Sequence, residues 1–480
     1  MSRPPDTSTS TLSHLVQSRS GGRLSAQPHL FLVLQADHPL AYSARCCLRD
    51  VEELAVGRSV DGGETRLEKL DAASGAKLSV RDRWMSSSHA VMRRKVDSWT
   101  IEDKQSKNGT FVNGQRCERA SLEDGDLLEL GHTFFIFRSA ISAHANAPAF
   151  VDTSGLRPAA AGMVTLLPGL VEQLANLEVI APSSVSVVIH GESGTGKELI
   201  AQAIHRLSGR GGAFVAVNCA SLPRTLVESE LFGYRKGAFS GATEDRPGLI
   251  RSADQGTLLL DEIGDLPAEA QAVFLRVLQE SEVLPVGATR PVKVDIRLLA
   301  ATHRDLEALV AAHQFRADLF ARISGLTISL PPLRERREDL GLLLRSLIRR
   351  HFPDRTEQIT LSTDAARAML LYDWPLNVRE LEKYLTAAVV LARGQPIQEA
   401  HFPGPLRAAL HREQKAERAP APDLEREPLG EADRQRREQL IQLLRQHAGN
   451  ITSVARAMGK ARFQVQRWIK RYRIDTKEFR

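Results

Sequence analysis

The sequence predicts several domains of different fold classes: an all-β sandwich, an α/β domain with a parallel sheet, and an all-α end. Short β-type runs broken by turns extend from His29 to Phe137, which is typical of a β-sandwich. From Val185 onward, apolar strands alternate with helical segments, which indicates a parallel sheet covered by helices. Near the end, two short helical segments flank Gly459, as in a helix-turn-helix.

The length and composition of the chain limit how many domains, which partners and which compartment we expect. A chain of 480 residues with 42% hydrophobic content has room for about three domains with real cores. The net charge of +6 is weak evidence for nucleic-acid binding. The cysteines, four in number, have neither metal-ligand nor disulfide spacing, so we expect a reduced, cytoplasmic protein. The sequence has no long apolar run, and Met1 to Gln27 has no apolar segment of the kind found in signal peptides, so we expect no signal peptide, no membrane span and no membrane partner.

The polar residues of the first domain gather in its connections. They include an arginine after Gly57, the run Ser86-Ser87-Ser88-His89, and the stretch from Asp103 to Thr110. An arginine, small hydroxyls and an asparagine on neighbouring loops can bind a phosphate ester and the adjoining peptide backbone. Ordinary turn chemistry selects the same residue types. From the residues alone, both interpretations stay open.

The order and spacing of these groups resemble the forkhead-associated (FHA) domain, a phosphothreonine-peptide binder, over nearly the whole segment. The segment before it, 1–27, is rich in serine, threonine and arginine, and we expect a disordered tail there. The resemblance implies an FHA domain at 28–139, with His89 and Gly109 bracing the loops. The ligand would be a phosphothreonine in another protein, or one in the chain's own tail at Thr7, Thr9 or Thr11. The residues placed around the phosphopeptide are Arg58, Ser86, Ser87, Lys107 and Asn108.

The stretch GESGTGKE, from Gly191 to Glu198, lies between an apolar run and a helical segment, as a phosphate-binding loop requires. Its glycines allow backbone N–H groups to point inward, and the next helix presents its positive end to an anion. Lys197 supplies charge for the outer phosphates. Glu198 stands where a hydroxyl would bind magnesium, so that ligand must come from elsewhere. The predicted nucleotide-binding residues of this loop are Gly191, Glu192, Ser193, Gly194, Thr195, Gly196, Lys197 and Glu198.

A second pair of candidate residues follows the apolar strand TLLL. Asp261 can hold Mg²⁺, and Glu262 can polarise an attacking water. A lone acidic pair after a strand is usually a solvated strand end. Its position downstream of a phosphate loop favours ATP hydrolysis.

Other residues become candidates for a role in ATP hydrolysis because of their order in the sequence behind the two nucleotide motifs. Thr302 and His303, on a neighbouring strand, can sense the γ-phosphate. Arg316 and Arg322 offer guanidinium groups of the kind that stabilise phosphoryl transfer in a neighbouring subunit. Arg379 can reach the nucleotide from a following helical subdomain. Each residue alone is more often a surface or salt-bridge residue, and only the order behind the nucleotide motifs favours the functional interpretation.

These motifs, together with ESELFGYRKGAFSGA (Glu228 to Ala242) and LPPLRERREDL (Leu330 to Leu340), resemble the AAA+ domain of bacterial enhancer-binding proteins. The resemblance covers about Pro168 to Pro405. The preceding stretch at 140–161 is rich in alanine, proline and serine and lacks periodicity, so we expect a linker there. At 162–405 the resemblance implies a P-loop ATPase with a helical lid that uses ATP and Mg²⁺. It also implies a hexamer whose subunits exchange arginine fingers, and makes Asn218 the residue that switches Glu262. The loop implied to touch sigma-54 is Gly237, Ala238, Phe239, Ser240, Gly241 and Ala242.

The AAA+ segment of this sequence departs from the family pattern at two positions. Ser240 stands where the sigma-contact loop usually has threonine, which keeps the hydroxyl and removes a methyl group. Leu376 stands where a glycine is common, at a turn. The first change concerns the strength of contact with the sigma factor, and the second concerns the conformation of a turn.

The C-terminal end follows an expected linker at 406–430. Helical segments are predicted at Arg437 to His447, Ile451 to Met458 and Arg462 to Tyr472. A basic last helix is often only a solvated face, but this end, 431–480, resembles a Fis-type helix-turn-helix that binds DNA. The candidate DNA contacts are Arg462, Gln464, Gln466, Arg467, Lys470 and Arg471.

The combined prediction is an activator that binds upstream DNA and remodels sigma-54 RNA polymerase with ATP, under control of a phosphothreonine. No Asp-phosphorylated receiver domain precedes the motor in this sequence. Two alternatives stay open: an AAA+ remodeller of another partner, and a DNA-binding repressor with a vestigial ATPase.

Overall fold

The computed structural model of the chain describes residues 24–60, 63, 65–70, 74–96, 98–153, 163–223, 225–408 and 431–447, and a few single positions beyond. These single positions are Val454, Ala457, Met458, Val465, Trp468, Ile469 and Ile474. The chain falls into two compact units, one up to residue 410 and one from residue 411. Within the described residues, no helix is long and apolar enough to cross a lipid bilayer.

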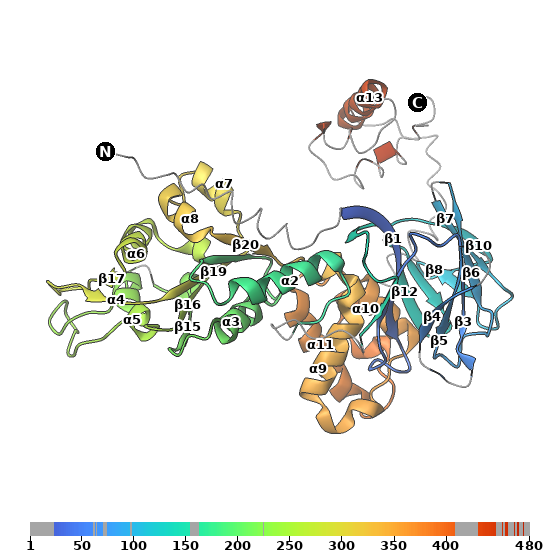
Figure 1. The fold of residues 1–480 in the computed structure, drawn as a ribbon, viewed down its shortest axis with the longest axis horizontal. Helices are drawn as coiled ribbons and strands as arrows, with labels where there is room; N and C mark the ends of the chain where they lie inside the picture. The colour runs from blue at the N-terminus through green and yellow to red at the C-terminus, as the bar shows by residue number, and fades with distance from the viewer. Residues whose placement is uncertain are drawn as a thin grey trace. The chain divides into compact units, whose positions relative to one another are not determined.

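The first domain is a β-sandwich, as predicted (Figure 1). Its strands are β1 (Leu24–Gln35), β2 (Ala44–Cys47), β3 (Glu53–Arg58), β4 (Arg66–Lys69), β5 (Gly75–Val80), β6 (Ala90–Lys95), β7 (Ser98–Asp103), β8 (Thr110–Val112), β9 (Gln115–Cys117), β10 (Arg119–Leu122), β11 (Leu127–Leu130), β12 (Thr133–His144) and β13 (Phe150–Asp152). One sheet has the order β13-β2-β1-β12-β11-β8-β9, and the other β10-β7-β6-β3-β5-β4. Leu30, Leu54 and Phe135 pack in the core that both sheets share.

The ends of this domain differ from the prediction. Strand β1 begins at Leu24, inside the expected tail, and pairs with β12 from its first residue. Strand β12 runs to His144, and β13 pairs with β2 through Phe150 and Asp152. The expected linker at 140–161 therefore begins with ordered sheet. Its alanine-rich and serine-rich composition hid these strands, because their side chains carry little of the apolar signal on which strand prediction depends.

The second domain is the predicted α/β domain. Its elements are α2 (Pro168–Ile180), β14 (Val187–His190), α3 (Lys197–Ser208), β15 (Phe214–Asn218), η2 (Cys219–Ser221), α4 (Val227–Phe232), α5 (Leu249–Ser252), β16 (Thr257–Asp261), η3 (Ile263–Asp265), α6 (Ala268–Glu280), β17 (Glu282–Val283), β18 (Val292–Lys293), β19 (Arg297–Thr302), α7 (Leu306–Ala311), α8 (Ala317–Ile323) and β20 (Leu326–Ser329). The main sheet has the order β15-β16-β19-β14-β20, and every pairing in it is parallel.

Helices cover both faces of this sheet because alternate strand residues point to opposite sides. Val187 and Ile189 of β14 pack with α2 and α3. Val188, between them, packs in the opposite layer with α4, α6 and α8. This arrangement brings the carboxyl ends of β14, β16 and β19 to one edge, where ligands bind in such sheets.

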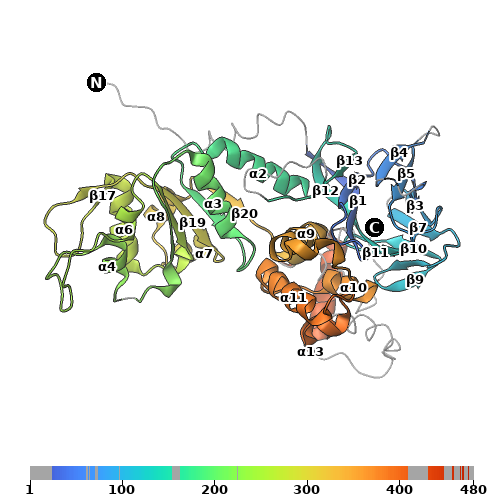
Figure 2. The same cartoon turned by 90° about the horizontal axis from the view of Figure 1, so that it is seen from below.

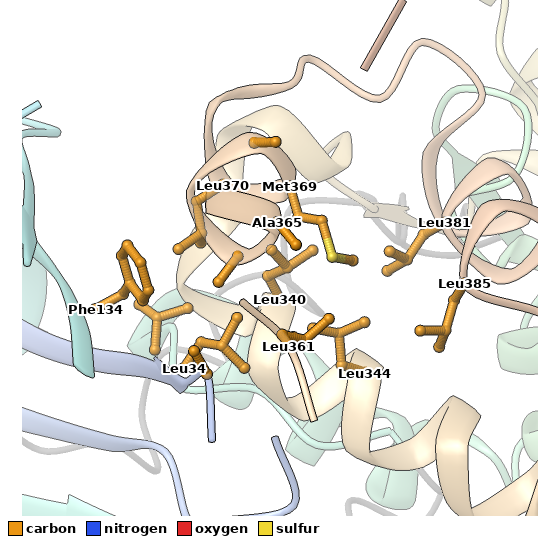
Figure 3. Packing of buried hydrophobic residues seen from close by; sticks show 14 of the residues in the cluster. Leu34, Phe134, Leu340, Leu344, Leu361, Ala365, Met369, Leu370, Leu381 and Leu385 are labelled. Carbon is orange, nitrogen blue, oxygen red and sulfur yellow. The ribbon is translucent and has the colours of Figure 1, made fainter. Parts of the chain in front are cut away.

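A helical lid follows. It contains η4 (Leu333–Glu335), η5 (Arg337–Asp339), α9 (Leu340–His351), η6 (Pro353–Gln358), α10 (Thr363–Leu371), α11 (Asn377–Ala392) and η7 (Glu399–His401). In both views the lid helices lie beside β1 and β12 of the sandwich (Figure 2). Leu34 and Phe134 of the sandwich share one apolar cluster with Leu340, Leu370 and other lid residues (Figure 3). The sandwich and the lid therefore have a common core.

The C-terminal unit contains α13 (Glu431–Gln446), which begins before the predicted Arg437. Leu440 and Leu444 of this helix pack with Val454, Val465 and Ile474. Most of the predicted second and third helices lies outside the described residues, as does most of the linker at 406–430. The helix-turn-helix stays a prediction.

Candidate functional site

The phosphate-binding loop joins β14 to α3. Gly194 and Gly196 have φ angles of +79° and +105°, a region that residues with a side chain rarely adopt. A Cβ atom at Gly194 would also lie 2.2 Å from the carbonyl oxygen of Leu376. The glycine at 194 is thus required twice, by its backbone angle and by the close approach of the lid.

Lys197 begins helix α3 and is only 8% exposed. Its Nζ donates to the carbonyl oxygen of Gly191 at 2.9 Å and lies 3.4 Å from Oε1 of Glu262. The ammonium group is therefore held between the phosphate loop and the acidic end of β16. A nucleotide phosphate would bind in competition with these contacts.

Asp261 and Glu262 stand at the carboxyl end of β16, as the sequence predicts for a magnesium ligand and a catalytic carboxylate. Burial, and then the charge of Glu262, raise the pKa of Asp261. Burial also acts to raise the pKa of Glu262, but the hydrogen bond from His303 and the charge of Lys197 outweigh it, so this pKa is lowered. Nδ1 of His303 lies 2.7 Å from Oε2 of Glu262. Glu262 is therefore an ionised carboxylate at neutral pH.

Asn218 ends β15, next to Asp261 in the sheet register. Its Oδ1 accepts a hydrogen bond from the backbone N–H of Ala220 at 2.9 Å and so caps η2. Glu262 is held by Lys197 and His303 instead. The switching role of Asn218 stays a prediction.

Thr302 and Arg379 both reach the phosphate loop. The backbone N–H of Gly191 donates to the carbonyl oxygen of Thr302 at 3.0 Å. Nη1 of Arg379, in the first turn of α11, donates to Oγ of Ser193 at 3.1 Å. Glu198 is exposed on α3, and its Oε1 accepts from Gln202 at 3.3 Å. The lid thus contributes an arginine to the nucleotide end of the sheet.

Arg316 is the residue before helix α8, Arg322 lies in the last turn of this helix, and both are exposed. Arg316 donates to Asp318 through Nε and Nη2, at 3.0 and 2.7 Å. Arg322 donates to the carbonyl oxygen of Leu278 at 3.1 Å. Among the described residues, neither guanidinium bonds to the phosphate loop of its own chain, so their predicted action on a neighbouring subunit stays a prediction.

The loop Gly237 to Ala242 is the tip of a longer excursion between α4 and α5. Gly237 N–H donates to the carbonyl oxygen of Ala242 at 2.8 Å and closes the tip. The ring of Phe239 is 41% exposed and stands edge-on to Tyr234, with the ring centroids 4.9 Å apart. Ser240 is exposed beside it. A half-exposed aromatic ring on a closed tip can contact another protein.

The five residues predicted to bind a phosphopeptide line one pocket in the sandwich, beside Arg83, Trp84 and Met85. They are Arg58, Ser86, Ser87, Lys107 and Asn108. The guanidinium of Arg58 and the ammonium of Lys107 are exposed, and within the described part of the chain neither makes an ion pair. Unpaired positive charge beside serine hydroxyls suits a phosphate ester.

Hydrogen bonds fix the loops around this pocket. Oγ of Ser86 accepts from the N–H of Lys107 at 3.1 Å, and Nδ2 of Asn108 donates to the carbonyl oxygen of Trp84 at 2.7 Å. Nδ1 of His89 accepts from Ser86 N–H, so Nε2 carries the proton toward the carbonyl oxygen of Gly109. Burial lowers the pKa of His89, which keeps the ring neutral in this bracing position.

Sequence reasoning missed several residues at both sites. Arg83 lies in the pocket lining, 5.3 Å from the Trp84 ring centroid. Asn377 donates from Nδ2 to the carbonyl oxygen of Ser193 at 3.0 Å. Arg336 donates to the carbonyl oxygen of Thr195 at 2.9 Å. An arginine in a run of charged residues resembles a solvated surface, and the motif LPPLRERREDL marked the segment that contains Arg336 without indicating its contact with the phosphate loop.

The predicted DNA contacts lie outside the described residues. They are Arg462, Gln464, Gln466, Arg467, Lys470 and Arg471. Of this end of the chain, the structure describes apolar positions such as Val465 and Ile469, which pack with α13.

Comparisons with known proteins match this architecture. Residues 164–329 match the Sigma-54 interaction domain, 334–419 the AAA+ ATPase lid domain, and 55–131 the FHA domain. The transcriptional regulatory protein ZraR of Klebsiella oxytoca is 44% identical over 63% of this chain and 67% of its own length. The regulatory protein AtoC of Escherichia coli is 42% identical over 65% of this chain and 68% of its own length. The chain belongs to the sigma-54-dependent transcriptional regulators.

The central domain of this sigma-54-dependent regulator is thus an ATPase domain of the AAA+ class, and its N-terminal sandwich is an FHA domain. The chain spans about two thirds of the length of the curated relatives named above. A solved structure of NtrX from Brucella abortus in complex with ATP is 30% identical over 66% of this chain and 70% of that chain, with a TM-score of 0.47.

Proposed function

We propose that the protein is a cytoplasmic transcription activator that binds DNA upstream of a promoter and uses ATP hydrolysis to remodel RNA polymerase carrying sigma-54. The observation that carries this proposal is the convergence of Lys197, Glu262 and Arg379 on one phosphate loop, in a chain that also presents an exposed tip at Phe239. We assign the first three residues to ATP hydrolysis and the exposed tip to contact with sigma-54.

In this proposal the loop amides and Lys197 bind the β- and γ-phosphates, and Arg379 closes the lid over them through Ser193. Asp261 would hold Mg²⁺, because a carboxylate is the kind of protein ligand that this ion takes in nucleotide sites. The ion, when bound, neutralises the charge that develops on the phosphates. Glu262, held ionised by His303 and Lys197, orients the attacking water and accepts its proton.

Arg316 and Arg322 complete the site from a neighbouring subunit of a homo-oligomer, which we propose is a hexamer. Their exposure on α8 and their exclusion from the chain's own phosphate loop, within the described residues, support a role in trans. The DNA contacts proposed from the sequence hold this assembly upstream of the promoter.

The FHA domain is the proposed input. Arg58 and Lys107 supply unpaired positive charge, and Ser86 and Ser87 supply hydroxyls, at one pocket that suits a phosphothreonine. The ligand is either another phosphoprotein or a phosphorylated Thr7, Thr9 or Thr11 of the chain itself.

The test uses the purified full chain with Lys197→Ala and Glu262→Gln. We expect Lys197→Ala to lose ATP binding, and Glu262→Gln to bind ATP but hydrolyse it at least about a hundredfold more slowly, as general-base removal does. Equal loss of binding in both variants would contradict the assigned roles.

A second measurement is transcription from sigma-54 promoters with purified polymerase. Stimulation that requires both hydrolysis and the upstream DNA site is the expected result. ATP hydrolysis without stimulation would favour a remodeller of another partner. DNA binding without hydrolysis would favour a repressor.

A further inference from the structure

The lid segment from Leu333 to Asp339, called the strut below, lies between the phosphate loop and the FHA domain. On its nucleotide side, Arg334 donates to both carboxylate oxygens of Glu192, at 2.8 and 2.5 Å. Nη2 of Arg336 donates to the carbonyl oxygen of Thr195 at 2.9 Å. Two arginines of the strut therefore hold the backbone and a side chain of the phosphate loop.

The next residues of the strut contact the other side. Nη2 of Arg337 donates to the carbonyl oxygen of Gly125, in the turn before β11 of the FHA domain, at 3.0 Å. Glu338 Oε1 lies 3.0 Å from Nε of Arg138, on β12. Consecutive residues of one short segment thus bind the phosphate loop and the FHA domain.

Reorienting the strut would cost free energy because its charged side chains are buried. Arg336, Glu338 and Asp339 are 2%, 2% and 1% exposed. A buried charge that loses its partner is strongly destabilising, so each contact keeps the segment in place. Asp339 is anchored by the N–H of Leu166 at 2.8 Å and by the hydroxyl of Thr165 at 2.7 Å.

Packing also joins the FHA domain to the lid. Phe134 and Leu34 insert into the lid cluster around Leu340 (Figure 3). A Cβ atom at Gly341, just after the strut, would lie 1.9 Å from the carbonyl oxygen of Val33 in β1. The backbones of the lid and the FHA domain are therefore in direct contact.

Hydrogen bonds link the phosphopeptide pocket to the face of the FHA domain that packs on the lid. Asp82 accepts from Trp84 N–H in the pocket wall at 2.8 Å, and from the hydroxyl of Thr133 at 2.8 Å. Thr133 precedes Phe134, which packs on the lid. A contiguous path of hydrogen bonds and packed side chains runs from the pocket to the strut.

We propose that the strut couples the two sites: a phosphothreonine peptide bound at the FHA pocket changes the affinity of the phosphate loop for nucleotide. Arg334 and Arg336 are positioning residues of the loop, and Arg138 and Gly125 fix the strut from the FHA side. This inference rests on the nucleotide and phosphopeptide sites of the proposed function. Because binding free energies are linked, nucleotide must change peptide affinity by the same factor.

The first test measures binding of a fluorescent ADP analogue to the full chain with Arg138→Ala and, separately, Arg337→Ala. Neither residue lies at the nucleotide site, yet we expect each change to alter nucleotide affinity about fivefold or more, the usual lower range of such coupling. The matched control is Arg93→Ala, which removes an FHA arginine paired with Glu53 and Glu102 on the other sheet. It should leave the affinity unchanged.

Two further variants separate coupling from general damage. Arg138→Lys keeps a cation beside Glu338 and should restore part of the affinity that Arg138→Ala changes. Glu338→Gln added to Arg138→Ala should have less effect than in the parent chain, because the pair is already broken. Additive effects of the two substitutions would overturn the role of this pair.

The second test repeats the nucleotide titration with a pool of phosphothreonine peptides at saturation and with the same pool unphosphorylated. We expect a shift of about fivefold with the phosphorylated pool only, and its loss in Arg138→Ala. A parent chain that binds both ligands without mutual effect, and whose nucleotide affinity survives Arg138→Ala and Arg337→Ala, would overturn the coupling alone. A parent chain that binds no nucleotide would overturn the proposed function itself.

Discussion

Arg367 of lid helix α10 donates to Oε2 of Glu129 on β11 through Nε at 3.0 Å and Nη2 at 2.7 Å. Both side chains are largely buried, so this is an ion pair inside the contact between the lid and the FHA domain. Burial raises the pKa of Glu129, and the pairing with Arg367 opposes it.

Loss of one partner therefore costs more than loss of both. Arg367→Ala leaves the Glu129 carboxylate buried and unpaired and should lower the free energy of unfolding by about 3 to 5 kcal/mol. Glu129→Gln in the same chain should recover part of that loss. Urea unfolding of the full chain measures both. The exposed pair Arg66 and Glu68 provides the control, since Arg66→Ala should change stability by less than about 1 kcal/mol.

The hydrogen bond from His303 helps to keep the pKa of Glu262 below its ordinary value. We expect His303→Ala to raise that pKa, because burial then acts with less opposition. The acid limb of the profile of kcat/KM for ATP against pH should move to higher pH. His313→Asn, which changes an exposed histidine of the same domain, should leave the limb in place. An unshifted limb in His303→Ala would separate His303 from the ionisation of Glu262.

Arg58 is the exposed guanidinium of the FHA pocket. A charge-assisted hydrogen bond contributes about 1.5 to 3 kcal/mol, so Arg58→Ala should weaken phosphothreonine-peptide binding about tenfold or more. Calorimetric titration of the full chain with a phosphorylated peptide and its unphosphorylated twin measures this. Arg119→Ala, an exposed arginine on β10, is the control. Equal affinity of the parent chain for both peptides would show that the domain does not read phosphate.

Phe239 stands on the tip that we propose contacts the sigma factor. Phe239→Ala should leave ATP turnover and DNA binding within about twofold and abolish stimulation of sigma-54 transcription, because the ring has no contact with the phosphate loop in the described residues. Leu284→Ala, another exposed apolar side chain of this domain, is the matched control. Normal transcription with Phe239→Ala would place the sigma contact elsewhere.

His29 is buried in β1, where burial lowers its pKa from 6.5 to about 4. The unfolded chain binds a proton at higher pH than the folded chain, so stability is complete above about pH 6.5 and falls as the pH drops toward 4. His29→Gln should flatten the profile of stability against pH in this window. Urea midpoints from pH 4 to pH 7 check it, and an unchanged slope would contradict the shift.

The fold was largely predictable where local pattern and motif agree. The strand, loop and helix around Lys197 are confirmed, and so is the parallel sheet that ends at Asp261. The shared core of the sandwich and the lid was not predicted, although the sequence contains one indication of it. The run LFLVL at Leu30 to Leu34 is continuously apolar, and in β1 both of its faces are buried, one inside the sandwich and one against the lid.

Other contacts could not be predicted from any pattern in the sequence. Arg336 contacts the phosphate loop across a long stretch of chain, and its neighbours in sequence contact a different domain. Charge alone does not distinguish such a residue from a solvated one. The positions of Arg316 and Arg322 relative to a neighbouring subunit depend on assembly, which single-chain patterns do not encode.

The direct contact between Val33 and Gly341 has a consequence for dissecting the protein. A fragment that ends at residue 139 would lose β13 and expose Phe31, Val33 and Phe134 to water. Such an uncovered patch is an aggregation hazard during expression. For the same reason, grafting this sensor onto another motor requires a lid surface shaped to receive it, so exchange of input domains between relatives is restricted to lids that carry a matching small residue and apolar face.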